Sequence, residues 1–129
     1  MRKNALITGG TKGIGKSIAT SLAGKGYDLI LTYSTDQNAA QEAVTKLQQE
    51  YDIVVRLLKA DATAVASISQ INEYIEENNI KLDAVIFNAG ITCRDAFENI
   101  KIEDWERVFF ANVHFPVFLL QSIIGKINK

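Results

Sequence analysis

The residues best suited to chemistry form a glycine-rich segment near the start of the chain, TGGTKGIG at residues 8–15. Glycines allow a tight turn and let backbone N–H groups approach a phosphate closely. A helix that begins behind such a turn adds free N–H donors and partial positive charge. A short apolar run precedes the segment, and Ile14, Ile18 and Leu22 follow at helical spacing. The pattern predicts a strand, a phosphate-binding loop and a helix.

Two general nucleotide-binding patterns compete for this segment. The dinucleotide pattern GxGxxG fails, because Ile18 stands where its third glycine is required. The P-loop pattern, GxxxxGK followed by Ser or Thr, fits residues 10–17, where Lys16 would hold phosphates and Ser17 a Mg²⁺ ion. A P-loop protein also needs an aspartate at the end of a second buried strand, and the apolar run 82–87 is followed by no acid. A P-loop NTP-binding protein therefore stays open as an alternative.

A third pattern, TGxxxGxG, matches Thr8, Gly9, Gly13 and Gly15, and further matches follow it in order along the chain. They are an acidic residue at Asp61, the segment Asn88-Ala89-Gly90 after an apolar run, and a helical asparagine at Asn112. With these residues the sequence resembles the short-chain dehydrogenase/reductase family. Within that family it looks most like the 3-oxoacyl-(acyl-carrier-protein) reductases, because Ile91-Thr92 and Arg94-Asp95 also resemble their loop. One departure is Phe87, where the family usually has a further asparagine, which puts the local backbone hydrogen bonding in doubt.

The resemblance implies a nicotinamide cofactor and assigns residues to its site. Asp61 would face the adenine, and Asn112 would hold a water of the proton relay as part of the catalytic machinery. No metal site is implied. The cofactor-binding residues implied by the resemblance are Gly9, Thr11, Lys12, Gly13, Ile14, Gly15, Tyr33, Ser34, Asp61, Ala62, Asn88, Ala89 and Gly90.

The residue types after the second apolar run favour NADP(H) over NAD(H). An acid at that position would accept hydrogen bonds from the ribose hydroxyls of NAD and repel a 2′-phosphate. This chain has Tyr33 there, followed by Ser34 and Thr35. Lys12 resembles the basic residue with which family members pair the 2′-phosphate, a favourable charge-assisted contact. Asp36 flanks the position without occupying it.

Alternating strand and helix signals must position these residues. Apolar runs at 4–8, 28–33, 53–58 and 82–87 predict strands, and helical stripes lie at 13–25, 38–51, around 68–75, and from 103 to the end. Alternation predicts a parallel sheet covered on both faces, an α/β, doubly wound Rossmann-like three-layer sandwich. The resemblance implies the partial strand order 3-2-1-4. Residues 1–129 would be the N-terminal nucleotide-binding part of a single Rossmann domain, without its C-terminal catalytic half.

Composition sets further bounds. The chain has 14 basic and 15 acidic side chains, so its charge gives no reason to expect binding to nucleic acid or an anionic membrane. The single cysteine, Cys93, favours a reducing, cytoplasmic location. The uncharged stretch 108–125 contains Asn112, His114 and Pro116 among its apolar residues, so we expect a helix buried on most sides and not a membrane span. Pro116 should kink or divide it.

The family's chemistry is hydride transfer between a nicotinamide and a carbonyl or alcohol, and it requires a serine and a YxxxK pair beyond the asparagine helix. None of the tyrosines at 27, 33, 51 and 74 has lysine four residues later. We therefore expect the chain alone to be inactive. It would belong to an NADP-dependent oxidoreductase, whose substrate the resemblance suggests is a 3-oxoacyl thioester of acyl-carrier protein in fatty acid biosynthesis. A non-catalytic nucleotide-binding or assembly module is the other reading.

Self-association is a further expectation. Half of a sheet would leave the fourth strand as an open edge, which is a template for pairing. The last helix would lack its usual cover. We expect it to expose Phe115, Phe118, Leu119 and Ile123.

Overall fold

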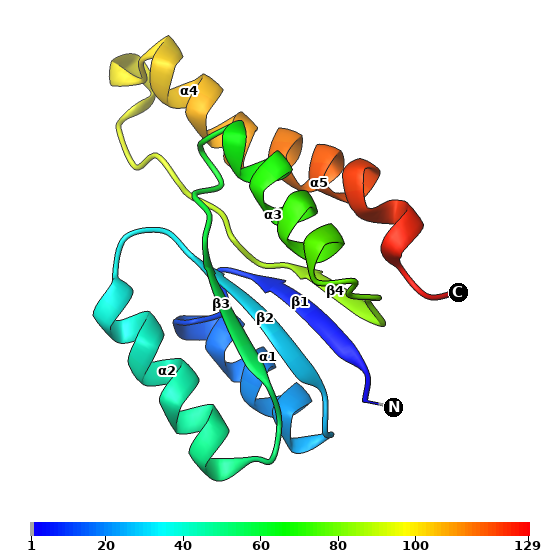
Figure 1. Cartoon of the computed structure of the whole chain (residues 1–129). Helices are drawn as coiled ribbons and strands as arrows, with labels where there is room; N and C mark the ends of the chain where they lie inside the picture. Colours follow the sequence, from blue (N-terminus) through cyan, green and yellow to red (C-terminus); the bar gives the residue numbers. More distant parts are fainter. Residues whose placement is uncertain (1) are drawn as a thin grey trace.

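The computed structural model describes residues 2–129 and contains one parallel sheet of four strands in the order β3-β2-β1-β4 (Figure 1). The strands are β1 Asn4–Thr8, β2 Asp28–Tyr33, β3 Val55–Lys59 and β4 Ala84–Phe87. This confirms the predicted strand order. β3 and β4 begin two residues later than predicted, because Ile53 and Leu82 are buried by packing without joining the strand ladders.

Helices cover both faces of the sheet, which confirms the three-layer prediction (Figure 1). On one face, α1 (Gly13–Gly24) and α2 (Gln37–Glu50) pack on strand residues that include Ile7 and Leu31. On the other face, α3 (Ala66–Glu77) and α5 (Phe115–Ile123) pack on Leu6 and Ile30. Neighbouring residues of one strand thus enter opposite cores, which explains the continuous apolar runs in the sequence.

The predicted long helix is divided. It begins as α4 (Ile102–Phe109), passes through a π-helical turn (Phe110–His114), and continues as α5 and a short 3₁₀ turn (Ile124–Lys126). Pro116 lies in the first turn of α5, directly after the π turn. Proline has no N–H to donate and its ring crowds the preceding turn, so a widened turn before it relieves the conflict. The break predicted at Pro116 is therefore a π-helical turn directly before α5.

The expectation that this helix is buried on most sides is wrong. Only 22% of its most apolar window is buried, and Ile102–Lys126 is long and apolar enough to cross a membrane by length and composition. Phe115, Leu119 and Ile123 are buried against α3, so the expectation that they are exposed is also wrong. Phe118 is exposed as expected. One stripe is covered because Ile71 and Ile75 of α3 lie over it.

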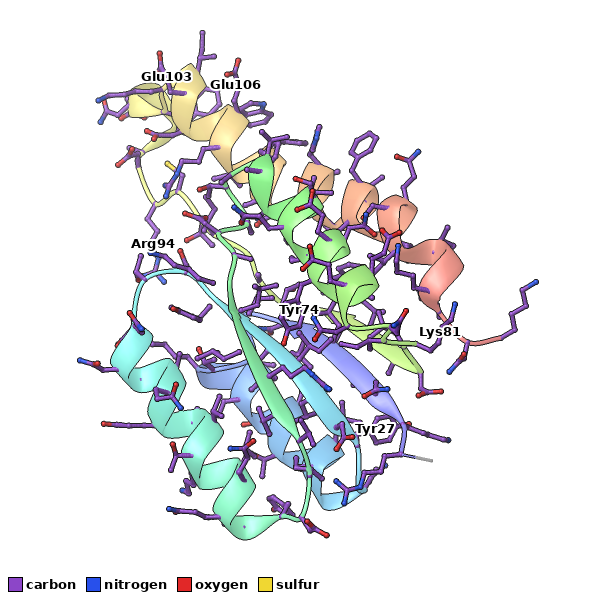
Figure 2. The ribbon with its side chains drawn as sticks, in the orientation of Figure 1. Tyr27, Tyr74, Lys81, Arg94, Glu103 and Glu106 are labelled. Carbon is purple, nitrogen blue, oxygen red and sulfur yellow. The ribbon has the colours of Figure 1, made fainter. Side chains whose placement is uncertain are left out.

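The opposite side forms what we call the outer helix face: Trp105, Phe109, Val113, Val117 and Phe118, all exposed. These residues line a shallow groove of about 440 Å³ that also includes Phe110 and His114. The His114 ring stacks between those of Phe110 and Phe118, at centroid distances of 4.4 and 4.5 Å. Figure 2 shows Glu103 and Glu106 projecting from α4 away from the sheet. The outer helix face is therefore an apolar surface beside charged side chains.

The end of the chain returns to the sheet. Ile127 forms a single parallel bridge with Leu82, with hydrogen bonds from the Leu82 N–H to the Lys126 carbonyl and from the Asn128 N–H to the Leu82 carbonyl, both 2.8 Å. Within residues 2–129, β4 has a ladder partner only on its β1 side. The expected open edge is present beyond the bridge.

Candidate functional site

A cleft of about 260 Å³ lies at the carboxyl ends of β1, β2, β3 and β4, where ligands bind in open parallel sheets. Most of the predicted cofactor residues line it. They are Gly9, Tyr33, Ser34, Asp61, Ala62, Asn88, Ala89 and Gly90, together with Thr32, Ala60 and Ile91. The structure thus gathers residues from four separate parts of the chain around one cleft.

The remaining predicted residues lie around the start of α1. Thr11, Lys12 and Gly13 line a second hollow of about 330 Å³, whose far wall is α2. Ile14 is 75% exposed on the opposite side of the helix start, and Gly15 is buried beneath the loop. The glycine loop therefore separates the cleft from the hollow against α2.

Two buried threonine hydroxyls fix the glycine loop to its neighbouring strands. Thr8 Oγ1 accepts hydrogen bonds from the backbone N–H groups of Asn88 and Ala89, both at 3.1 Å. Thr32 Oγ1 accepts one from the Gly9 N–H at 3.0 Å. Thr32 was not among the predicted site residues. A threonine in an otherwise apolar strand was the available signal, because a buried hydroxyl needs a partner.

Gly15 has to be a glycine because the loop and β4 meet directly above it. A Cβ at this position would collide with the Gly9 carbonyl and with the Asn88 side-chain amide. That amide donates from Nδ2 to the Gly9 carbonyl oxygen at 3.0 Å. Gly9 itself has a φ of +65°, a conformation that glycine adopts without strain. The spacing of these glycines is thus set by contact between two strands' loops.

Phe87 does not disturb this network. The three hydrogen bonds that Asn88 and Ala89 make to Thr8 and Gly9 are all formed, and Phe87 is at the end of β4 with its ring partly exposed. The doubt that Phe87 raised about local hydrogen bonding is therefore removed.

Asp61 is held by its own turn. Its Oδ1 accepts from the Thr63 N–H at 2.8 Å and from the Thr63 hydroxyl at 2.7 Å. The Thr63 N–H is the main cause that lowers the pKa of Asp61. The Thr63 hydroxyl, Arg107 and Ser34 act in the same direction, against the opposing effect of burial. The carboxylate is therefore ionised at neutral pH and sits fixed in the wall of the cleft.

Asn112 lies in the π turn and clamps the loop that follows β4. Its Oδ1 accepts from the Ile91 N–H at 2.9 Å, and its Nδ2 donates to the Ile91 carbonyl at 2.8 Å. Gly90 leaves room for it, since a Cβ there would come within 2.9 Å of Asn112 Oδ1. The wider π turn and this double hydrogen bond place the helix asparagine beside the cleft. The role of Asn112 in holding a relay water stays a prediction.

Lys12 forms an ion pair with Asp36. Its Nζ lies 3.1 Å from Asp36 Oδ2, with both side chains largely exposed. Asp36 also caps α2, because its Oδ1 accepts from the Ala39 N–H at 3.0 Å. The pair joins the glycine loop to the start of α2.

The P-loop alternative receives no support from the geometry. Lys16 lines the hollow against α2, whereas Ser17 lines a different hollow between α1 and Ile86 of β4. A P-loop lysine and serine act on one Mg²⁺-nucleotide. Neither residue lines the cleft.

Three groups able to ligate a metal come close together outside the cleft. Ligand atoms of Cys93, Asp95 and Asp104 lie within 4.8 Å of one another, and the Cys93 thiol donates a hydrogen bond to Asp95. Partly exposed acidic groups often approach this closely without an ion, so the cluster alone assigns no site.

Comparison with known proteins gives a consistent result. The family model described as short chain dehydrogenase matches residues 3–129. An uncharacterised oxidoreductase, YmfI of Bacillus subtilis, is 42% identical over 90 residues, which are 70% of this chain and 36% of that protein. A hydroxynaphthalene reductase-like protein, Arp2 of Metarhizium anisopliae, is 34% identical over 119 residues, or 92% of this chain and 44% of that protein.

Solved structures show the same fold. A short chain dehydrogenase from Burkholderia cenocepacia in complex with NADP matches with a TM-score of 0.91 and 26% identity, covering 98% of this chain and 51% of that one. A blue fluorescent protein from a metagenomic library, in complex with NADPH, matches with a TM-score of 0.88 and 30% identity, covering 97% and 51%. The chain spans half or less of the length of the curated relatives it matches.

Proposed function

Since the chain belongs to the short-chain dehydrogenase family, we propose that it supplies the NADP(H)-binding portion of an enzyme that transfers hydride to a carbonyl. The single observation that carries this proposal is the cleft at the carboxyl ends of the four strands. It combines a glycine turn at a helix start, suited to a pyrophosphate, with a fixed carboxylate at Asp61 and the Asn88–Gly90 backbone. Its size suits the adenosine part of the cofactor.

The preference for NADP(H) over NAD(H) is supported by charge. Tyr33 and Ser34, which line the cleft after β2, carry no negative charge to repel a 2′-phosphate. Lys12 stands in the glycine loop at the N-cap of α1 and could pair with that phosphate.

For catalysis we propose that the serine and tyrosine–lysine pair come from outside these 129 residues, which contain no YxxxK. Asn112 would contribute to the proton relay. The substrate we propose is a 3-oxoacyl thioester of acyl-carrier protein, in a cytoplasmic enzyme. The support is the resemblance of residues 91–95 to the loop of those reductases. Reduction of a 3-oxoacyl thioester and of unrelated ketones by a longer protein that includes this chain would test that choice.

We further propose that this part of the protein self-associates. The support is the outer helix face, where Trp105, Phe109 and Val117 are exposed on one continuous surface. Exposed apolar patches of this kind are typical of association surfaces. Light scattering that shows a monomer at high concentration would contradict this.

The testing experiment is a calorimetric titration of the chain with NADPH, NADH and Mg·ATP. We expect binding of NADPH in preference to NADH, weakened by Lys12→Ala. Lys16→Ala is the matched control, because it removes an equal charge four residues further along, inside α1, and leaves the Lys12–Asp36 pair intact. Binding of Mg·ATP alone, lost in Lys16→Ala, would replace the proposal with a P-loop function. Self-association without any nucleotide binding would favour an assembly module.

A further inference from the structure

The Lys12–Asp36 ion pair places a negative charge next to the cation expected to recognise the 2′-phosphate. Asp36 Oδ2 lies 3.1 Å from Lys12 Nζ. A lysine already paired to a carboxylate presents less net positive charge to an incoming phosphate. The same carboxylate also repels a phosphate that approaches the lysine.

Asp36 cannot easily turn away from this position. Its other oxygen, Oδ1, accepts a hydrogen bond from the Ala39 N–H at 3.0 Å and so caps α2. The short link from Tyr33, at the end of β2, to the cap carries Ser34, which lines the cleft. The cap thus holds the carboxylate beside Lys12, three residues after Tyr33 at the end of β2.

We infer that Asp36 is a specificity-determining residue that lowers discrimination for the 2′-phosphate by sharing Lys12 with it. Binding of a 2′-phosphorylated nucleotide requires Lys12 to exchange the Asp36 carboxylate for the phosphate. Binding of a nucleotide with a free 2′-hydroxyl leaves the pair intact. The inference rests on the proposed function, because it assumes that the adenosine ribose lies in the cleft.

The consequence is a limited preference for 2′-phosphorylated nucleotides. It is set by a carboxylate three residues beyond Tyr33, the last residue of β2. Neutralising Asp36 would leave Lys12 free for the phosphate. Asparagine and serine both serve as helix N-caps, so either substitution keeps the cap while it removes the charge.

The test uses two probes that need only the adenosine part of the site, 2′,5′-ADP and 5′-AMP, titrated calorimetrically into the wild-type chain and its variants. We expect Asp36→Asn and Asp36→Ser to tighten 2′,5′-ADP binding by about threefold to tenfold at low salt, the size of one Coulomb contact in water. Binding of 5′-AMP should change by less than about twofold, since it carries no 2′-phosphate. The gain for 2′,5′-ADP should shrink at high ionic strength, which a purely structural effect would not do.

Asp52→Asn is the matched control. Asp52 forms a similar exposed ion pair, with Arg2 at 3.3 Å, but precedes β3 at the amino end of the sheet. It should leave both affinities unchanged, which excludes net charge as the cause.

The outcomes separate this inference from the proposed function. If the wild-type chain binds 2′,5′-ADP and both Asp36 variants bind it equally well or more weakly, the inference is overturned while the proposed function stands. If no form of the chain binds either probe, the adenosine site itself is overturned, and the inference with it.

Discussion

The cleft at the carboxyl end of the sheet and the outer helix face differ in whether their side chains find partners within the chain. Around the cleft, the buried hydroxyls of Thr8 and Thr32 and the Asn88 amide all have partners. Within residues 2–129, no buried side-chain polar atom lacks a hydrogen bond. On the outer helix face, by contrast, Trp105 and Phe109 are exposed, with their ring centroids 4.9 Å apart.

This difference shows which interactions are local to the chain. The cleft is built from strand ends and loops that all lie within these residues, so its geometry is preorganised. The outer helix face is apolar, and no segment of residues 2–129 covers it. Changes at the cleft should therefore reduce folding stability and nucleotide binding together, whereas changes on the outer helix face should alter association only.

The largest effect is expected for Gly15→Ala. The new methyl group would push the Gly9 carbonyl and the Asn88 amide apart, which we expect to cost about 3 kcal/mol of unfolding free energy and to abolish NADPH binding. Urea denaturation and calorimetry measure both. Gly24→Ala is the matched control at the other end of α1, where the nearest neighbour, Tyr51, is 3.8 Å away. Equal stability of the two variants would contradict the close contact.

Thr8→Val should follow. Valine has the same shape but cannot accept from the Asn88 and Ala89 N–H groups, so we expect a loss of about 2 kcal/mol and weaker NADPH binding. Thr20→Val, which removes only an exposed bond within α1, should cost less than about 0.5 kcal/mol. A Thr8→Val chain that unfolds at the wild-type urea midpoint would show that the hydroxyl is not needed to fix β4.

On the outer helix face, the double substitution of Val113→Lys and Val117→Lys should weaken self-association at least about tenfold, which corresponds to 1.4 kcal/mol. Both side chains are exposed, so the urea midpoint and NADPH affinity should stay near wild type. Sedimentation velocity reports the association. Gln121→Lys adds charge to the same helix outside the apolar groove and should not dissociate the assembly. Dissociation by both variants would assign the effect to charge alone.

Asn112 connects the two regions. It belongs to the helical segment that forms the outer helix face, and its side-chain amide binds the Ile91 backbone beside the cleft. The next substitution is Asn112→Leu. We expect a loss of about 1 kcal/mol in stability, since the site is solvent-exposed. Asn112→Asp keeps the acceptor and loses the donor, so its effect should be intermediate. Amide hydrogen exchange at Ile91 checks the clamp, and protection unchanged in Asn112→Leu would count against it.

The smallest effect is expected from Asp61 at low pH. The Thr63 N–H lowers its folded pKa below the ordinary 3.8. The carboxylate therefore stabilises the fold above that pH and loses this contribution as pH falls through the folded pKa. Wild type should be more stable than Asp61→Asn at pH 7, and the difference should shrink below about pH 4. A difference that is constant between pH 7 and pH 3 would contradict the assignment.

The order of helices and strands along the chain was predictable from the sequence, because apolar runs that alternate with helical stripes favour a parallel sheet covered on both faces. The order of the strands within the sheet came from the family resemblance. The sequence also marked the loop at Gly9 and Gly15, since glycines allow close backbone approach, whereas Asp61 and the Asn88–Gly90 segment were assigned through the family resemblance. It missed Thr32, whose hydroxyl acts across two strands that are distant along the chain.

The remaining features depend on contacts between elements that are distant along the chain. Which side of the long apolar helix is buried depends on where α3 lies, and periodicity carries no information about that neighbour. The π turn before Pro116 reflects the backbone's response to a crowded ring. Lys12 and Asp36 are far apart in sequence, and their pairing depends on the distance between the glycine loop and the start of α2. Residue types fix local conformations, whereas contacts between distant elements exist only once the sheet has assembled.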